Sequence, residues 1–178
     1  MVDEELYQII HKAKGGDQEA FAELVKRFKG HVYRYAVGML SNRMDAEDVS
    51  QEAFVKAFYS ISGLDNEFAF SSWMIRIAAN LCKDRLKKRA KEKEFSDEQP
   101  NEHLVDPNIP DPSVKLSIEE CLSRLSIDHR EVILLHDVQG YRYEEIADTL
   151  EVPLGTVKSR LFAARMALRK ELAKEEQG

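Results

Sequence analysis

The prolines of this chain divide it into two parts. Four of its five prolines lie between Pro100 and Pro112, in a stretch with many acidic residues and no lysine or arginine. Proline interrupts helices, and a stretch this polar buries too little apolar surface to offset the entropy lost on ordering. We therefore predict a flexible acidic linker at 93–113, between one domain at 1–92 and a second domain at 114–178.

Composition favours helices in both domains. Apolar residues make up 43% of the sequence, charged residues 33%, and there are only eight glycines, which is typical of a soluble helical protein. No apolar run approaches the roughly 18–20 residues of a membrane-spanning helix, and the acidic start MVDEELYQII does not resemble a signal peptide. We predict an all-α, cytoplasmic protein. Cys82 and Cys121 lie in apolar helical patterns and are expected to be reduced thiols in or near the core.

Apolar residues spaced by three and four predict helices throughout the first domain. The stretch DQEAFAELVKRFKGHVYRYAVGML carries one apolar stripe, for which Asp17 is a suitable N-cap. A second helix is expected from about Asp45, through DAEDVSQEAFVKAFYSI. A third, WMIRIAANLCKDRLKKRAKEK, ends with seven lysines or arginines and two acids between Lys83 and Lys93.

The stretch YEEIADTLEVPLGTVKSRLFAARMALRK, residues 143–170, predicts a helix-turn-helix. The first helix ends near Glu151, and Pro153 suits the first position of the second helix. Between Leu154 and Lys170 there are five basic residues and no acid. A helix with such a face fits the major groove of DNA, where its cations neutralise phosphates. The alternative is a solvated basic face on a structural helix.

An aromatic-bearing loop, SGLDNEFAFSS, precedes the basic helix of the first domain. Aromatic side chains beside a basic helix suit single-stranded DNA, because unpaired bases enter pockets while the backbone follows the positive surface. Phe68, Phe70 and Trp73 can equally be core aromatics, and their spacing leaves this open.

Together these features resemble the extracytoplasmic-function (group IV) sigma factors of the sigma-70 family. The first domain resembles sigma region two in GDQEAFAELVKRF, DAEDVSQEAFVKAF and FSSWMIRIAANLCKDRLKKR. The second resembles region four in LSRLSIDHREVILLHDVQGYRYEEIADTLEVPLGTVKSRLFAARMALRK. The resemblance covers about three quarters of the chain, in the same order. It implies two small helical domains, no catalytic residue, no cofactor and no metal. The implied function is to bind core RNA polymerase, direct it to specific promoters and help open the minus-10 element.

The resemblance also implies roles for individual residues. Binding to core polymerase would involve Asp45, Glu47, Asp48, Gln51, Glu52, Phe54, Val55 and Phe58. Capture of an unpaired minus-10 base would involve Phe68, Phe70, Trp73, Arg76, Asn80, Lys83, Asp84 and Lys87. The helix-turn-helix, at about 142–161 and onward, would bind the minus-35 element through Arg142, Thr156, Lys158, Ser159, Arg160, Phe162, Arg165 and Arg169.

The implied partners are core RNA polymerase (its β′ coiled coil and β flap), promoter DNA and an anti-sigma factor that can hold the protein at the membrane, with no small-molecule substrate. Family members usually have Ser at Arg142, Gly at Glu151 and His-Arg at Phe162-Ala163. We therefore expect capping at Arg142 to be weaker or to come from elsewhere, Glu151 to adopt a left-handed backbone or to reshape the turn, and the minus-35 contacts to be altered.

Two other classes of protein compete with this interpretation. A stand-alone helix-turn-helix regulator would bind duplex DNA without polymerase, usually as a two-fold dimer. An enzyme is disfavoured because His11, His31, His103, His129 and His136 are scattered, with no nucleophile or carboxylate at useful spacing.

Overall fold

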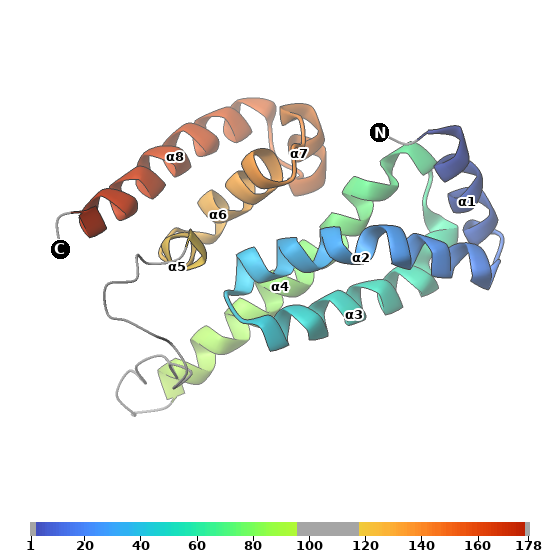
Figure 1. The fold of residues 1–178 in the computed structure, drawn as a ribbon, viewed down its shortest axis with the longest axis horizontal. Coiled ribbons are helices and arrows are strands. Elements are labelled where there is room, and N and C mark those ends of the chain that lie inside the picture. The colour runs from blue at the N-terminus through green and yellow to red at the C-terminus, as the bar shows by residue number, and fades with distance from the viewer. Residues whose placement is uncertain (1–2, 96–117, 177–178) are drawn as a thin grey trace.

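The computed structural model describes residues 3–95 and 118–176, where every regular element is helical (Figure 1). The all-α prediction is therefore confirmed over these residues. The first domain contains α1 (Glu4–Lys14), α2 (Gln18–Leu40), α3 (Arg43–Ser60), η1 (Ile61–Gly63), η2 (Glu67–Ala69) and α4 (Phe70–Phe95). The second contains α5 (Ile118–Ser123), α6 (Ile127–Ile133), η3 (Leu134–Val138), α7 (Tyr143–Leu150) and α8 (Leu154–Glu176). The predicted linker at 93–113 lies outside the described residues, except for the last three residues of α4.

Side-chain caps mark the starts of the first helices. The Asp17 carboxylate accepts a hydrogen bond from the backbone N–H of Ala20 (3.0 Å), so the N-cap predicted for α2 is confirmed. Asn42 caps α3 in the same way, through the N–H of Asp45 (3.0 Å). These caps satisfy N–H groups that have no partner within the helix. The link at 41–42 is so short that α2 and α3 run antiparallel, side by side (Figure 1).

The core of the first domain lies where α2, α3 and α4 meet. Leu24 of α2, Ala53 of α3, and Phe70 and Met74 of α4 are all buried there. The last turns of α4 extend beyond the ends of α2 and α3 (Figure 1) and carry the basic run that the sequence places there. This projecting end is mostly polar because it has no helix of the bundle to pack against.

A buried arginine organises the start of the second domain. Arg130 is buried and donates to the carbonyl oxygens of Leu122 (2.8 Å), Ser123 (2.8 Å), Leu125 (3.1 Å) and Met39. The first three carbonyls belong to the end of α5 and the turn after it, where helical partners are lacking. Arg130 therefore closes this turn and also reaches the first domain.

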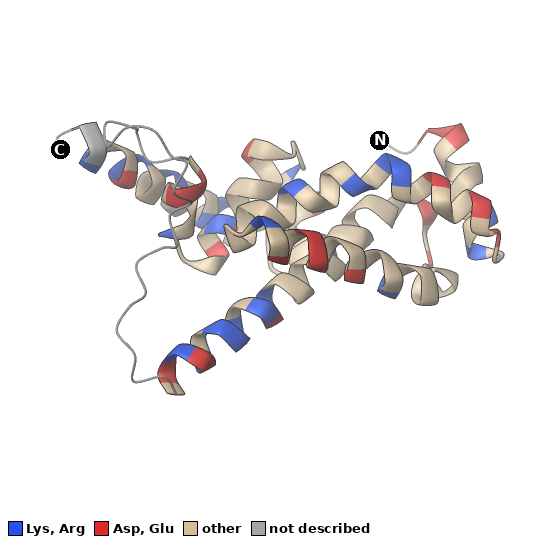
Figure 2. Ribbon diagram, turned by 60° about the horizontal axis from the view of Figure 1, so that its bottom comes forward, with Lys and Arg blue, Asp and Glu red and all other residues tan. Residues whose placement is uncertain are grey.

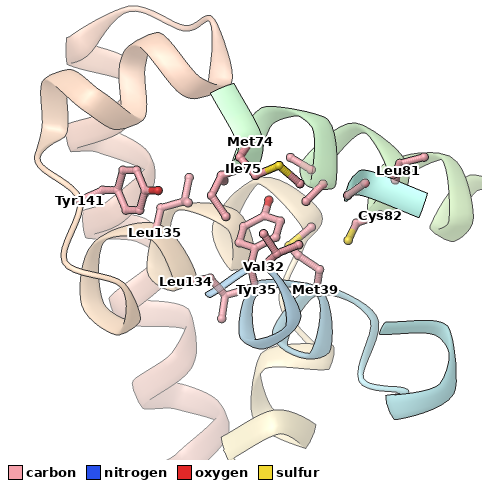
Figure 3. Packing of buried hydrophobic residues seen from close by; sticks show 14 of the residues in the cluster. Val32, Tyr35, Met39, Met74, Ile75, Leu81, Cys82, Leu134, Leu135 and Tyr141 are labelled. Carbon is pink, nitrogen blue, oxygen red and sulfur yellow. The ribbon is translucent and has the colours of Figure 1, made fainter. Parts of the chain in front are cut away.

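The two domains pack against each other through one continuous buried cluster (Figure 3). Leu134 and Leu135 of the second domain lie among Val32 and Tyr35 of α2 and Ile75 of α4. This contact between the domains was not predicted from the sequence. It brings α7 against α4, so the predicted minus-10 helix faces the helix-turn-helix.

Gly38 of α2 allows the second domain to approach closely. A Cβ atom built at Gly38 would overlap the side chain of Leu134. Both residues are buried, and Leu134 is only 2% exposed, so little free space remains for an added methyl group. The close contact between α2 and η3 therefore depends on glycine at this position.

Candidate nucleic-acid and protein interfaces

The outer side of α3 combines acidic and apolar side chains. Glu47, Asp48, Gln51 and Glu52 are exposed, in agreement with their predicted place on a binding surface. Val55 is 56% exposed although it is apolar. An apolar side chain within a polar rim is typical of a protein–protein interface.

Two of the residues predicted for this surface lie elsewhere. Phe54 is buried and packs α3 against the core of the first domain. Asp45 is half-buried and forms ion pairs with Arg85 (3.1 Å) and Arg89 of α4. Both residues therefore hold α3 against the bundle.

The same side of α3 includes aromatic and apolar residues beyond those predicted for it. Phe58, which was predicted, is 41% exposed, with its ring centroid 5.1 Å from that of Phe21. Tyr59 and Met44, at the two ends of α3, are more exposed still. Helical periodicity assigns apolar residues to the core, so the sequence pattern gave no signal for Met44.

The aromatic residues near the start of α4 have different environments. Phe70 is fully buried, with its ring centroid 5.0 Å from that of Phe28, so the core alternative is correct for this residue. Trp73 is half-buried, with its ring centroid 5.8 Å from that of Phe70. Phe68 is 62% exposed and lies against Tyr7 of α1 (5.4 Å between centroids). Phe68 is thus the most accessible of the three for stacking on a base.

The polar face of α4 is divided between solvent and the second domain. Asn80, Asp84 and Lys87 are exposed, and the basic residues toward the end of the helix form the blue band in Figure 2. Arg76 and Lys83 instead contact the second domain. Three of these five predicted minus-10 residues are therefore accessible, and two are engaged within the protein.

Arg76 binds the C-terminal end of α7. Its guanidinium donates to the carbonyl oxygens of Thr149 (3.3 Å) and Asp148, and it pairs with the Glu151 carboxylate (3.1 Å). Carbonyls at a helix C-terminus carry partial negative charge, so a cation is stabilised there.

Lys83 binds a buried carboxylate. Its Nζ lies 2.9 Å from Oε1 of Glu131, which also accepts a hydrogen bond from the hydroxyl of Tyr35 (3.2 Å). Glu131 is 1% exposed, and its Oε2 has no hydrogen-bond partner among the described residues. Burial raises the pKa of Glu131 and outweighs the opposite effect of Lys83 and Tyr35. Burial also raises the pKa of the Cys82 thiol to about 12.

Tyr141 of the second domain lies against the first turn of α4 and against α2. Its hydroxyl is 2.6 Å from Oγ of Ser71 and 3.0 Å from Nε2 of His31. These residues line a cavity of about 220 Å³ together with Phe68. Burial raises the pKa of Tyr141 to about 12, so its hydroxyl remains protonated at neutral pH.

The predicted helix-turn-helix is present as α7 and α8. Arg142 provides no side-chain cap, and Glu145 accepts a hydrogen bond from its backbone N–H (2.7 Å). Glu151 has φ of 56° and ψ of 44°, the left-handed conformation expected where the family usually has glycine. At Arg142 the capping interaction thus comes from another residue, Glu145, and at Glu151 the left-handed alternative is the one observed.

The outer face of α8 is accessible. Lys158, Ser159, Arg165 and Arg169 are exposed, and Phe162 is 72% exposed. Thr156 and Arg160 are half-buried, and Arg142 is exposed at the start of α7. Five of the eight predicted minus-35 residues thus lie exposed on α8, with Phe162 as an apolar contact among cations.

Two arginines of this face have carboxylate partners in the second domain. Arg160 pairs with Asp128 (2.9 Å). Arg165 donates to both carboxylate oxygens of Asp137 (3.1 and 2.5 Å), and this hydrogen bonding raises the pKa of Arg165. These pairs orient the two guanidiniums and brace α8 on α6 and η3.

The structure shows no group of metal ligands and no membrane-spanning helix in residues 3–95 and 118–176. Within these ranges, no three His, Cys, Asp or Glu side chains are grouped as metal ligands would be. No helix there has the length and apolar character needed to cross a bilayer.

Comparison with known proteins identifies the family. Residues 24–92 match the family described as Sigma-70 region 2, and residues 115–168 match Sigma-70, region 4. The chain is 35% identical over 176 residues to the ECF RNA polymerase sigma factor SigW of Bacillus subtilis, covering 92% of this chain and 94% of SigW. It is 33% identical over 177 residues to the ECF RNA polymerase sigma-E factor of Escherichia coli K12, covering 90% of each.

A solved structure supports the same assignment. The sigma factor RpoE of Bartonella quintana, in complex with the anti-sigma factor NepR, is similar with a TM-score of 0.70 and 26% identity, covering 86% of this chain and 96% of RpoE. Sequence and structure therefore agree across both domains. The chain belongs to the extracytoplasmic-function sigma factors of the sigma-70 family.

Proposed function

We propose that this protein binds core RNA polymerase through α3, reads the minus-35 element with α8 and captures an unpaired minus-10 base at the start of α4. The observation that carries the proposal is the separation of these surfaces. The acidic and apolar side of α3 and the basic face of α8 belong to different domains, and both are exposed. One protein can thus contact the enzyme and duplex DNA at the same time.

The chemistry of each surface suits its proposed partner. Glu47, Asp48 and Val55 offer an acidic rim and an apolar centre to a polymerase subunit, for which we propose the β′ coiled coil. Lys158 and Arg169 offer charge to phosphates, and Phe162 offers an apolar contact to a base edge. Binding of the unpaired base would offset the few kcal/mol needed to unstack it, without ATP.

We also propose the partners and the location that follow from this function. The second domain would contact the β flap of polymerase. An anti-sigma factor would inhibit the protein, as suggested by likeness to RpoE, which was solved with NepR. The protein would act in the cytoplasm, without catalytic activity, cofactor or small-molecule substrate, and the anti-sigma factor could hold it at the membrane.

Run-off transcription tests the proposal directly. Purified core enzyme would be incubated with genomic fragments, with and without this protein, and transcript 5′ ends would be mapped. We expect a small set of new start sites, preceded at constant spacing by shared minus-35 and minus-10 sequences. Transcription that is no more selective than with core enzyme alone would contradict the proposal. Gel shifts with the free protein test the regulator alternative, which requires tight duplex binding without polymerase.

A further inference from the structure

We infer that the second domain acts as an internal inhibitor of minus-10 binding in the free protein. It engages Arg76 and Lys83, two of the α4 residues proposed to bind a single strand, and leaves the α3 and α8 surfaces open. The two domains must therefore separate before the whole of this α4 face is available to a single strand. This inference rests on the proposed assignment of α4 to the minus-10 element.

The first contact occupies Arg76. Its guanidinium is shared between two carbonyls at the end of α7 and the Glu151 carboxylate (3.1 Å). A DNA phosphate would have to use the same N–H donors, since arginine binds carboxylates and phosphates with one planar fork. The backbone of Glu151 is in the left-handed conformation (φ 56°), which glycine adopts more easily than other residues. The side chain at this turn thus provides a bond between the domains that glycine would lack.

The second contact occupies Lys83. Its ammonium group lies 2.9 Å from the carboxylate of Glu131, which is almost completely buried between the domains. The Lys83 side chain is 31% exposed, so a phosphate that binds it would compete with the Glu131 carboxylate for the ammonium group.

The third contact lies at the first turn of α4. The ring of Tyr141 is 5.7 Å from the ring of His31 between centroids, and its hydroxyl bonds to Ser71 (2.6 Å). Phe68 lines the same cavity. An aromatic ring from the second domain therefore lies beside the start of α4, which is proposed to receive an unpaired base.

The contact between the domains covers part of the α4 surface and leaves the α3 and α8 surfaces exposed. Asp48 and Val55 of α3 are exposed, and so are Lys158 and Phe162 of α8. Of the three proposed surfaces, only the one on α4 is covered, and only in part. The closed protein can thus dock on polymerase through α3 while its minus-10 surface is still engaged.

Gly38 offers a way to open the protein without touching any proposed binding residue. An added Cβ would overlap Leu134 across the domain boundary. Gly30, on the same helix, is a matched control, because its Cβ would meet only the Arg34 side chain at 3.4 Å, an ordinary contact. Both changes to alanine favour helix α2 by about 1 kcal/mol, so a difference between them reports the domain contact.

The distance between the domains can be measured with fluorescent labels on the full chain. Ser62→Cys and Lys170→Cys place one label on each domain at exposed positions, while Cys82 and Cys121 are buried. We expect energy transfer to show one narrow distance distribution for the parent protein and for Gly30→Ala. Gly38→Ala, and Leu134→Lys from the other side of the contact, should give broader distributions.

The same variants should differ in binding to a fluorescein-labelled, random-sequence single-stranded DNA. We expect Gly38→Ala and Leu134→Lys to bind about fivefold more tightly than Gly30→Ala, since affinity scales with the fraction of open protein. The inference is wrong if the parent protein is already open. It is also wrong if neither variant opens it, or if opening leaves the affinity unchanged.

These results can be separated from a failure of the proposed function. A closed parent protein that gains single-strand binding on opening would support the inference even if core enzyme yielded no selective transcripts. Selective transcripts from a parent protein that is always open would support the function and reject the inference.

Discussion

Lys83 of the first domain and Glu131 of the second form an ion pair of 2.9 Å whose carboxylate is shielded from water. A buried pair of this kind contributes less than its geometry suggests, because removing a carboxylate from water costs several kcal/mol. The raised pKa of Glu131 has the same origin. The pair therefore fixes how the domains meet more than it stabilises them.

The raised pKa predicts how stability changes with pH. A carboxyl with a higher pKa in the folded protein than in the unfolded chain contributes most below its unfolded value, about 4.3 for Glu. Its contribution is lost as the pH rises through the folded pKa. Above about pH 4.3, the Glu131 contribution to the free energy of unfolding should therefore fall as the pH rises.

Glu131→Gln isolates this effect, because the amide keeps the shape and takes no charge. Urea unfolding at a series of pH values should show that the free energy of unfolding falls less with rising pH in the variant than in the parent protein. Near neutral pH the variant should be as stable as the parent protein or more stable. Glu144→Gln, at an exposed position of α7, is the control and should follow the parent protein. Parallel curves for Glu131→Gln and the parent protein would contradict the assignment.

Glu151→Gly should stabilise the protein. Glycine adopts the left-handed backbone at this position without the penalty of about 1 kcal/mol that a side chain incurs. The Glu151 side chain of the Arg76–Glu151 pair is mostly exposed, so losing the pair should cost less free energy than the relief of the backbone penalty provides. Thermal unfolding should show a higher midpoint for this variant and a lower one for Glu144→Gly, which places glycine inside a helix. A lower midpoint for Glu151→Gly would mean that the Arg76 contact outweighs the backbone strain.

Substitutions in α3 should separate surface residues from core residues. Val55→Glu should abolish co-purification with core polymerase and leave thermal stability nearly unchanged, because Val55 is exposed. Phe54→Ala should instead destabilise the first domain by about 3–5 kcal/mol, because it removes a buried ring. Ala22→Glu, exposed on α2, is the control for an added charge. Normal binding by a folded Val55→Glu protein would remove this side of α3 from the proposed interface.

Charge reversal on α8 should weaken promoter recognition and leave binding to core polymerase unchanged. Lys158→Glu with Arg169→Glu places two negative charges on the face proposed for the minus-35 element, and both positions are exposed. Run-off transcription from promoters that need this element should fall by at least about tenfold, while binding to core enzyme stays intact. Lys26→Glu with Lys29→Glu, on α2, adds the same charge elsewhere. If both double variants lose the same activity, net charge is responsible and the α8 assignment fails.

The sequence predicts elements better than it predicts accessibility. Local rules were sufficient for the Asp17 cap and for the left-handed turn at Glu151, because each depends on a few neighbouring residues. They failed to separate Phe54 from Val55, which are adjacent in the sequence but lie on different sides of α3. The spacing did not show which side the bundle would cover.

The contact between domains could not be predicted from periodicity at all. Leu134 lies in an apolar helical stretch and Tyr141 follows Gly140 in the turn before α7, and nothing near either residue in the sequence shows that their partners are Gly38 and Ser71. Such long-range contacts depend on the shapes of two assembled domains. For the same reason Arg76 and Lys83 could be assigned to a polar face, while their partners appear only in the structure.

The carboxylates that hold Arg160 and Arg165 also bear on how the protein would respond to ionic strength. A cation that already has an internal anion must give it up to bind a phosphate, so it displaces fewer counterions from the duplex than an unpaired cation would. The logarithmic slope of promoter affinity against salt should therefore be shallower than the number of basic residues on α8 suggests. A bacterium whose internal potassium rises sharply would lose less of this interaction than the raw charge count implies.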